Sequence, residues 1–427
     1  MEVGITILLI FVAALFLNVP VAFALGIASA ATLAIFNIVP QGYMIQSFFS
    51  AADSFPLLAV PFFILAGDIM LHGGISKRLV NFARAMMGGT SGALGIIMVV
   101  TCMIFASISG SGPATVAAIG GILIPAMIEE GYENSFSCSL AAAAGAMGPV
   151  IPPSISFVMY GVIASVSITE LFMAGIIPGI LMAVALIIYV KWVVKKRGFG
   201  IVREKASAKE KWKAFWDAKW SLLVPVIILG GIYGGICTPT EAAIIACDYG
   251  LIVGLFVYKE IKLKDLPVIL GKSALTAGTC LVLIGCATAF GRVLTLQSVP
   301  TILANAILSL TSNKFLILLF INILLFIVGM LMETLAAIVI LAPLLLSVVV
   351  PLGVDPVHFG VLMVVNLVIG MCTPPVGVNM FVGAKLGKIP VEKMFKYLFP
   401  MIGALLIAQL LITYIPQISL LLPSILS

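Results

Sequence analysis

The sequence predicts an all-α polytopic membrane protein that consists of two inverted structural repeats. Of its 427 residues, 62% are hydrophobic and only 9% are charged, whereas a soluble domain carries about 25% charged residues. Long apolar runs are therefore predicted to be helices that cross a lipid bilayer. The basic residues gather in four clusters, and prolines recur at matching positions in the two halves of the chain. The clusters predict the topology, and the prolines predict a duplication.

The four basic clusters set the orientation of the predicted helices. They hold 21 of the 23 Lys and Arg residues, and loops rich in these residues stay on the cytoplasmic side of a membrane. All four clusters are therefore placed inside the cell. Because the basic residues are not spread over one face, we expect no nucleic-acid partner. The clusters are Lys77, Arg78 and Arg84; ten residues from Lys191 to Lys219; Lys259, Lys262, Lys264 and Lys272; and Lys385, Lys388, Lys393 and Lys396.

Two pairs of apolar runs are predicted to be re-entrant hairpins. Each run holds 15 to 17 residues, and a spanning helix needs about 20. The sequences "SISGSGPAT" and "GMLMET" form the tips between the paired runs. The first hairpin is predicted at 91–128, and the second, at 314–350, enters the membrane from the opposite side.

Matching prolines indicate that the two halves arose by duplication. The pairs are Pro20 with Pro239, Pro125 with Pro343, and Pro149 with Pro374, at separations of 219, 218 and 225 residues. Each half is predicted to contain five spans and one hairpin, and an odd number of spans inverts the second copy. The predicted units are a first repeat at 1–194, a cytoplasmic linker at 195–220 and a second repeat at 221–427. The predicted spans are 3–19, 20–38, 56–74, 136–165, 171–194, 221–237, 240–258, 273–295, 357–384 and 398–424.

The linker is predicted to be an amphipathic helix on the membrane surface. It combines many lysines with aromatic residues that include Trp212 and Trp216. Such helices lie in the interface with their aromatic side chains among the lipid headgroups. We therefore expect the linker to contact lipid rather than to form a binding site.

Four interruptions of the apolar pattern are the candidate sites for chemistry. Two are the hairpin tips, and two lie within predicted spans, in "GAMGPVIPPS" and "GMCTPPVGVN". The consecutive prolines Pro152–Pro153 and Pro374–Pro375 remove amide donors and free carbonyl groups one turn earlier. Freed carbonyl groups are hard oxygen ligands of the kind that Na+ prefers. This pattern is typical of secondary transporters, whose sites lie where helices break.

The first hairpin tip is predicted to bind an anion. Gly110 and Gly112 permit a tight turn, and Pro113 suits the first helical position, so that free amides point towards the middle of the membrane. The alternative is that these small residues only permit close packing of helices. Hydroxyl groups that we expect at the same cavity belong to Ser109, Ser111, Thr115, Ser154 and Ser156.

Glu333 is an isolated carboxylate in the second hairpin. A carboxylate inside a membrane is costly, so a role in binding substrate or cation is expected, with a structural hydrogen bond as the alternative. We expect no Arg or Lys in the cavity. A dianion would then meet Glu333 unfavourably, whereas a hydroxylated monoanion would place its acidic group on the tip amides.

The sequence argues against catalysis. It contains neither GxSxG nor HExxH, and it has no pair of aspartates at membrane depth. Its seven cysteines lie singly in apolar runs without the spacing of metal ligands. We therefore predict that the protein is not an enzyme. A channel is disfavoured because no ring of charged residues lines a continuous path.

Four segments together resemble the large membrane subunit of TRAP (tripartite ATP-independent periplasmic) transporters. They are "SISGSGPATVAAIG", "IPPSISFVMYG", "GICTPTEAA" and "METLAAIVILAP". The resemblance implies an elevator-type, Na+-coupled importer of the ion transporter superfamily in a bacterial inner membrane. It also implies two partners, a small membrane subunit of four helices and a periplasmic substrate-binding protein. The alternative is a stand-alone Na+/carboxylate symporter with the same repeats.

The resemblance also implies the residues of the sites. Two or more Na+ ions would lie near Ser107, Gly110, Gly145 and Gly148, and near Gly329, Gly370, Thr373 and Val376. The substrate would lie between the tips, near Ser109, Ser111, Ser154, Ser156 and Glu333. Family substrates are organic acids, so we favour a sugar acid like sialic acid, followed by a C4-dicarboxylate.

Overall fold

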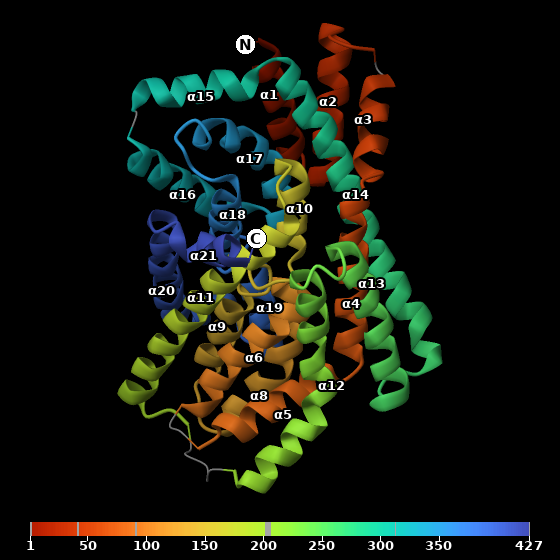
Figure 1. Cartoon of the computed structure of the whole chain (residues 1–427). Coiled ribbons are helices and arrows are strands. Elements are labelled where there is room, and N and C mark those ends of the chain that lie inside the picture. Colours follow the sequence, from red (N-terminus) through yellow and green to blue (C-terminus); the bar gives the residue numbers. More distant parts are fainter. Residues whose placement is uncertain (1, 41, 90–91, 201–205, 312, 427) are drawn as a thin grey trace.

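The protein is helical throughout the part of the chain that can be described. The computed structural model describes residues 2–40, 42–89, 92–200, 206–311 and 313–426, and every regular element within them is a helix (Figure 1). Residues 91 and 201–205, which belong to the predicted first hairpin and linker, lie outside these ranges. Among the described residues, eight helices are long and apolar enough to cross a membrane. The predicted all-α polytopic fold is confirmed.

The first half of the chain ends in a long helix that leads to the linker. Between α7 and α8, one turn of wider π-helix at Val116–Gly120 joins the two into a single helical arm. The helices of this half are α1 (Glu2–Phe16), α2 (Val21–Phe36), α3 (Gly42–Ala52), α4 (Ala59–His72), α5 (Ile75–Met87), α6 (Ala93–Ser109), α7 (Gly112–Thr115), α8 (Gly121–Glu129), α9 (Asn134–Gly145), α10 (Ile155–Ala164) and α11 (Ile168–Arg197).

The second half presents its helices in the same order. The uninterrupted α14 takes the place of α3 and α4, which are separated by the segment around Pro56. This order agrees with the predicted duplication. The helices are α12 (Ala208–Tyr233), α13 (Pro239–Ile252), α14 (Leu266–Leu296), α15 (Val299–Leu310), α16 (Lys314–Leu331), α17 (Thr334–Val349), α18 (Pro356–Gly370), α19 (Val378–Gly387), α20 (Phe395–Tyr414) and α21 (Gln417–Leu426).

The two hairpins form where the short apolar runs predict them. The first comprises α6 and the arm α7–α8, and the second comprises α16 and α17. In Figure 1, α6 and α8 lie in the lower part of the molecule, and α16 and α17 lie in the upper part. The hairpins therefore approach each other from opposite ends.

Two helices are broken at the proline pairs. The first break separates α9 from α10, and the second separates α18 from α19. Each half contributes to the packing of the other, because α10 packs against α17 and α19 packs against α9. We call the two hairpins with their broken helices, α6–α10 and α16–α19, the hairpin unit. Neither half of the sequence forms this unit alone.

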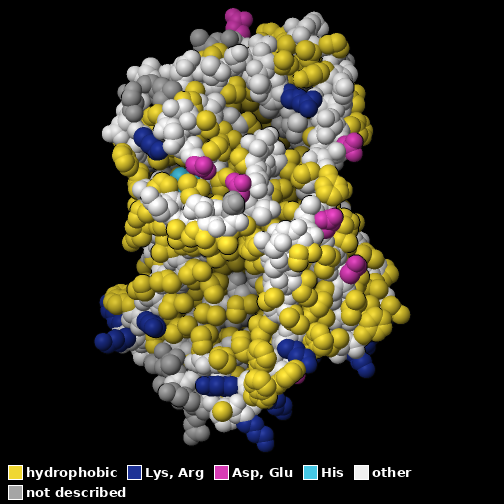
Figure 2. All heavy atoms as spheres, viewed as in Figure 1, with side chains coloured by type: hydrophobic (Ala, Val, Ile, Leu, Met, Phe, Trp, Pro, Cys, Tyr) yellow, Lys and Arg dark blue, Asp and Glu magenta, His cyan; other side chains and the backbone are white. Residues whose placement is uncertain are grey.

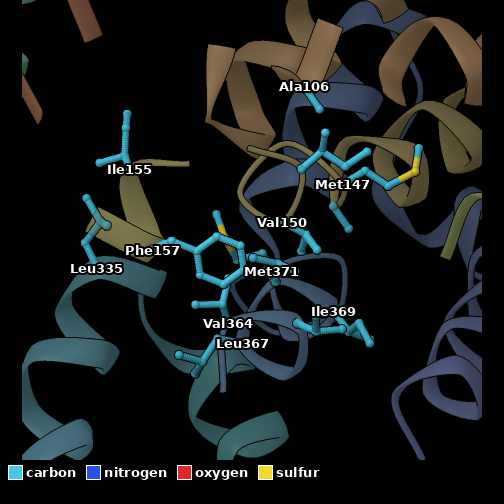
Figure 3. Packing of buried hydrophobic residues seen from close by; sticks show 14 of the residues in the cluster. Ala106, Met147, Val150, Ile155, Phe157, Leu335, Val364, Leu367, Ile369 and Met371 are labelled. Carbon is cyan, nitrogen blue, oxygen red and sulfur yellow. The ribbon is translucent and has the colours of Figure 1, made fainter. Parts of the chain in front are cut away.

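Apolar side chains from both halves fill the interior of the hairpin unit. Figure 3 shows Val150 and Phe157 of the first half beside Val364 and Met371 of the second. All four side chains belong to the buried core. Burial of this kind covers the non-helical backbone of the breaks, which lipid cannot solvate.

Some helix boundaries differ from the prediction. The linker is not a separate helix, because α12 begins at Ala208 and continues through the predicted boundary at residue 220. A capping box between Ser207 and Glu210 starts this helix. The predicted single span at 398–424 is wrong: the chain leaves α20 after Tyr414 and resumes at α21, since Pro416 cannot donate to the helix.

Charge is distributed as the topology requires. Figure 2 shows most of the visible Lys and Arg side chains at the lower end of the molecule, with hydrophobic side chains forming a broad belt above them. Basic loops stay on the cytoplasmic side. The lower end is therefore assigned to the cytoplasm, and the first hairpin enters from that side.

Labelling from each side of the membrane tests this orientation. Lys264 is exposed in a basic cluster, and Ser309 is exposed on α15. With the half-buried Cys237 and Cys280 replaced by alanine, an impermeant maleimide should modify Lys264→Cys only in inside-out vesicles. Ser309→Cys should react only in right-side-out vesicles. Reaction of both variants from the same side would contradict the opposed hairpins.

Candidate functional site

The tips of the two hairpins border a common cavity of about 610 Å³. Its opposite wall is formed by α4 and α14, which pack against each other. A smaller space of about 110 Å³ lies between the same tips and the start of α10. The lining of the large cavity is mainly apolar, and its hydroxyl-bearing and charged residues are Asp68, Ser109, Ser111, Lys272, Thr276, Thr279 and Glu333.

Hydroxyl groups hold the turn at the first tip. The Oγ of Ser109 and the Oγ1 of Thr115 are 2.8 Å apart, and Thr115 Oγ1 donates to the carbonyl oxygen of Ser111 at 2.8 Å. Gly110 has a φ of 58°, a left-handed conformation that glycine adopts without steric cost. A Cβ at Gly110 would also lie 3.0 Å from the carbonyl oxygen of Pro153. The tip is thus shaped to rest on the first break.

The first break meets the first tip backbone to backbone. A Cβ on Gly148 would lie 2.5 Å from the carbonyl oxygen of Ser111, and a Cβ on Gly145 would lie 3.2 Å from that of Gly112. Any side chain at Gly148 would push the two segments apart. The absence of side chains lets carbonyl oxygens of the tip and the break gather in one place.

The second break repeats this arrangement at the second tip. A Cβ on Gly370 would lie 2.5 Å from the carbonyl carbon of Gly329, and a Cβ on Gly329 would lie 2.6 Å from the carbonyl oxygen of Leu367. The amide of Val376 donates to the carbonyl oxygen of Met330 at 3.2 Å. Each tip is therefore supported by the break of its own half.

Most of the residues predicted to hold Na+ lie at these two contacts. Ser107 and Thr373 belong to the same two regions, and their hydroxyl groups donate to the carbonyl oxygens of Ile104 at 2.7 Å and Ile369 at 3.1 Å, which leaves lone pairs on the hydroxyl oxygens. Ligation of Na+ by this set stays a prediction. The residues at the contacts are Gly110, Gly145, Gly148, Gly329, Gly370 and Val376.

The predicted substrate residues divide into two groups. Thr115 belongs to the hydrogen bonds of the tip, and Ser154 caps α10, where it accepts from the amide of Phe157 at 3.2 Å and donates to the carbonyl oxygen of Pro149. Neither of them lines the two cavities described above. The other four do line them: Ser109, Ser111 and Glu333 the large cavity, and Ser156 with Ser111 and Glu333 the small one.

Glu333 is exposed to the cavity at the second tip. It directly precedes α17 as its N-cap residue, and the backbone amides of Leu335 and Ala336 in the first turn of that helix lie within reach of its carboxylate. The carboxylate also lines both cavities. The binding role and the structural alternative therefore both stay predictions.

The expectation that no Arg or Lys faces the cavity is wrong. Lys272 lines it from α14, and its Nζ lies 3.7 Å from Oδ1 of Asp68 on α4. In the sequence, Lys272 belongs to a basic cluster assigned to the cytoplasm, and nothing marks Asp68 as a site residue. Only the packing of α14 on α4 turns both side chains to one cavity. Helical spacing places Lys272, Thr276 and Thr279 on one face of α14, but it does not show which cavity that face lines.

Asn379 is a second residue that the sequence analysis missed. It is fully buried, and its Oδ1 has no hydrogen-bond partner. A Cβ on Gly112 would lie 2.9 Å from this oxygen. Asn379 follows the second break but faces the first tip, so it adds an uncommitted amide oxygen to the carbonyl groups there.

The donor set at the breaks suits a hard monovalent cation. Backbone carbonyl, hydroxyl and amide oxygens are the groups present, and oxygen ligands suit such ions. Across the described ranges, no group of three or more His, Cys, Asp or Glu residues is placed to hold a metal ion.

Opposed hairpins, paired breaks and a cavity between them define a secondary transporter, in which ions and cargo bind where helices break. The chain belongs to a specific family of such proteins. Its residues 8–418 match the model of the tripartite ATP-independent periplasmic transporter, DctM component. The resemblance to the large TRAP subunit and the prediction that the chain is not an enzyme are confirmed.

Three relatives illustrate the range of names in the family. The chain is 52% identical to the isethionate TRAP transporter permease protein DctMQ of Oleidesulfovibrio alaskensis, over 95% of this chain but only 64% of that protein. It is 38% identical to the C4-dicarboxylate TRAP transporter large permease protein DctM of Rhodobacter capsulatus, over 97% of both chains. It is also 38% identical to the sialic acid TRAP transporter large permease protein SiaM of Vibrio cholerae, over 96% of both.

A solved structure has the same fold. The crystal structure of the YdaH transporter of Alcanivorax borkumensis aligns with a TM-score of 0.66, covering 96% of this chain and 97% of that chain. The sequence identity is 15%. The similarity therefore concerns the fold alone.

Substitution of Gly370 tests the contact between tip and break. Gly370→Ala should destabilise the protein by about 1–3 kcal/mol, because the added Cβ meets backbone that cannot move aside. Gly403→Ala on α20 is the matched control, since a Cβ there meets nothing within 4 Å. Thermal unfolding of both variants in detergent measures the difference. Equal melting temperatures would contradict the close contact.

Proposed function

We propose that this chain is the large permease of a Na+-coupled TRAP importer of a small organic acid, located in a bacterial inner membrane. The observation that carries the proposal is the cavity between two opposed hairpin tips, each backed by a helix break. A small membrane subunit and a periplasmic substrate-binding protein complete the transporter. The family membership of the chain supports this assembly.

Coupling to Na+ is supported by the oxygen atoms at the two breaks. Each break brings freed carbonyl groups against a hairpin tip through glycine contacts, Gly148 at the first and Gly370 at the second. Two such places predict at least two coupling ions. Binding of cations there would hold each tip on its break and favour binding of an anion between the tips.

An elevator movement is supported by the position of the cavity. One wall belongs to the hairpin unit, and the other belongs to α4 and α14. Sliding of the hairpin unit along these two helices would carry a bound substrate across the membrane without opening the unit itself. The lining of the cavity extends to Lys272, in the cluster assigned to the cytoplasm. We therefore propose that this structure faces inward.

The proposed substrate is a small monoanion that also carries a hydroxyl group. Glu333 disfavours a second negative charge, and serine and threonine hydroxyl groups at the cavity favour hydroxylated ligands. The 52% identity to a protein named for isethionate, a hydroxylated sulfonate, supports that compound as the first candidate. A sugar acid like sialic acid comes next. Lys272 weakens the argument against a C4-dicarboxylate, which therefore stays as the third candidate.

Reconstitution tests the proposed function and separates it from the stand-alone symporter. Proteoliposomes should take up labelled isethionate only when they contain this chain with the small subunit, when the binding protein is present outside, and when an inward Na+ gradient is applied. Sialic acid and succinate, each with its own binding protein, serve as comparison substrates. Uptake by this chain alone would favour the stand-alone symporter. Uptake without Na+ would contradict the coupling.

Glu333→Gln tests the role of the isolated carboxylate. The variant should insert normally and lose about tenfold or more in uptake, because an interaction worth about 1.4 kcal/mol changes an equilibrium tenfold. Glu129→Gln is the matched control, since Glu129 is exposed at the end of α8 and lies outside the described cavities. Uptake by Glu333→Gln at the wild-type rate would remove Glu333 from the site.

A further inference from the structure

One face of α14 connects the hairpin tips with the cytoplasmic end of the cavity. Lys272, Thr276, Thr279 and Cys280 all line the cavity, and their spacing places them on one side of the helix. From Lys272 to Cys280 the helix rises about 12 Å, at 1.5 Å per residue. An anion that moved from the tips along this face would reach Lys272.

Lys272 is held loosely at the end of this path. Its side chain is 61% exposed, and its Nζ lies 3.7 Å from Oδ1 of Asp68, at the outer limit of an ion pair. Asp68 is held more firmly, because Ser273 Oγ donates to its Oδ2 at 2.7 Å. The bond from Ser273 already joins α14 to α4. The ammonium group is therefore free to exchange Asp68 for another anion.

The same ion pair lies beside the first hairpin tip. Gly67 precedes Asp68 on α4, and a Cβ on Gly67 would lie 3.5 Å from the carbonyl oxygen of Ser109. Asp68 is thus next to the point where α4 touches the tip. Lys272 and Asp68 belong to the wall of the cavity, whereas Ser109 belongs to the hairpin unit. A substrate bound at the tip would contact Lys272 only when the tip lies beside the Lys272–Asp68 pair.

We propose that Lys272 forms an anion-binding site at the cytoplasmic mouth of the cavity, where it receives the carboxylate or sulfonate of the substrate from the hairpin tips. The Asp68 carboxylate pairs with the Lys272 ammonium group until the substrate binds there. It pairs with the ammonium group again after the substrate leaves. The proposal rests on the proposed function and adds a cationic release site to it. The charged residues that line the cavity are Asp68, Lys272 and Glu333, so Lys272 is the positive group among them.

A purely structural pair predicts a different pattern from substitutions. If Lys272 and Asp68 only clamp α4 to α14, removal of either charge loosens the same contact and has the same effect. If Lys272 attracts the substrate and Asp68 competes for it, the two substitutions have opposite effects. Lys272→Met should weaken anion attraction, and Asp68→Asn should strengthen it.

The experiment measures anion attraction without a substrate. Thr276→Cys, one turn from Lys272, is placed in a Cys280→Ala chain within the complete transporter in inside-out vesicles. Its reaction rates are compared for two thiol reagents of similar size, the anionic sulfonatoethyl methanethiosulfonate and the cationic trimethylammonioethyl methanethiosulfonate. The ratio of the two rates cancels changes in accessibility. Peptide mass spectrometry identifies the modified cysteine.

Lys272→Met should lower the anion-to-cation rate ratio about fivefold, the effect of one exposed ion pair. Asp68→Asn should raise it. Lys264→Met, in the short 3-10 helix Leu263–Asp265 before α14 and outside the cavity lining, should leave it unchanged. An unchanged ratio in Lys272→Met would overturn the proposal. So would equal decreases in Lys272→Met and Asp68→Asn.

Counterflow of labelled isethionate then connects the site with transport. With isethionate at the cytoplasmic face, Lys272→Met should raise the half-saturating concentration about fivefold, as expected for the loss of one ion pair. Asp68→Asn should lower it. If the two substitutions shift the anion-to-cation rate ratio as expected but the wild type shows no isethionate counterflow, the proposed substrate is refuted and the anion site is retained. Normal wild-type counterflow that neither substitution changes would refute the release site and retain the proposed function.

Discussion

The structure depends on one constraint, which is that a broken helix inside a membrane must have its free backbone groups covered by protein. Lipid offers no hydrogen bonds, so irregular backbone at this depth persists only when it is buried or lines a polar cavity. Here each break lies against a hairpin tip, and glycines such as Gly148 and Gly370 permit contact between the backbones. The free backbone carbonyl groups, which would be costly to expose to lipid, are the candidate ligands for ions.

This constraint also explains why the two halves interlock. The end of each broken helix packs on the opposite half, α10 against α17 and α19 against α9. Asn379 illustrates the result, since it follows the second break yet places its amide oxygen beside Gly112 of the first tip. The hairpin unit is therefore a single body. One of its faces borders the cavity that α4 and α14 close on the other side.

Charge around the cavity follows from this division into two bodies. Glu333 belongs to the hairpin unit, whereas Asp68 and Lys272 belong to the helices that face it. In the proposed transport cycle, a negative group would move with the bound ligand, and a positive group would stay on the opposite wall. Such an arrangement suits a ligand that must be held between the tips and then released at the cytoplasmic side.

The class of protein, the two hairpins and the four breaks can be predicted from the sequence, because apolar run length and proline positions act locally on the backbone. The same pattern points to Ser109, Ser111, Ser156 and Glu333, which flank those breaks and line the two cavities at the tips. By contrast, the three-dimensional packing brings Lys272 and Asp68 to the large cavity and gives Thr115 and Ser154 hydrogen bonds to the backbone. Which side chains meet across helices distant in the sequence depends on the packing of α14 on α4, and periodicity within one helix carries no information about that contact.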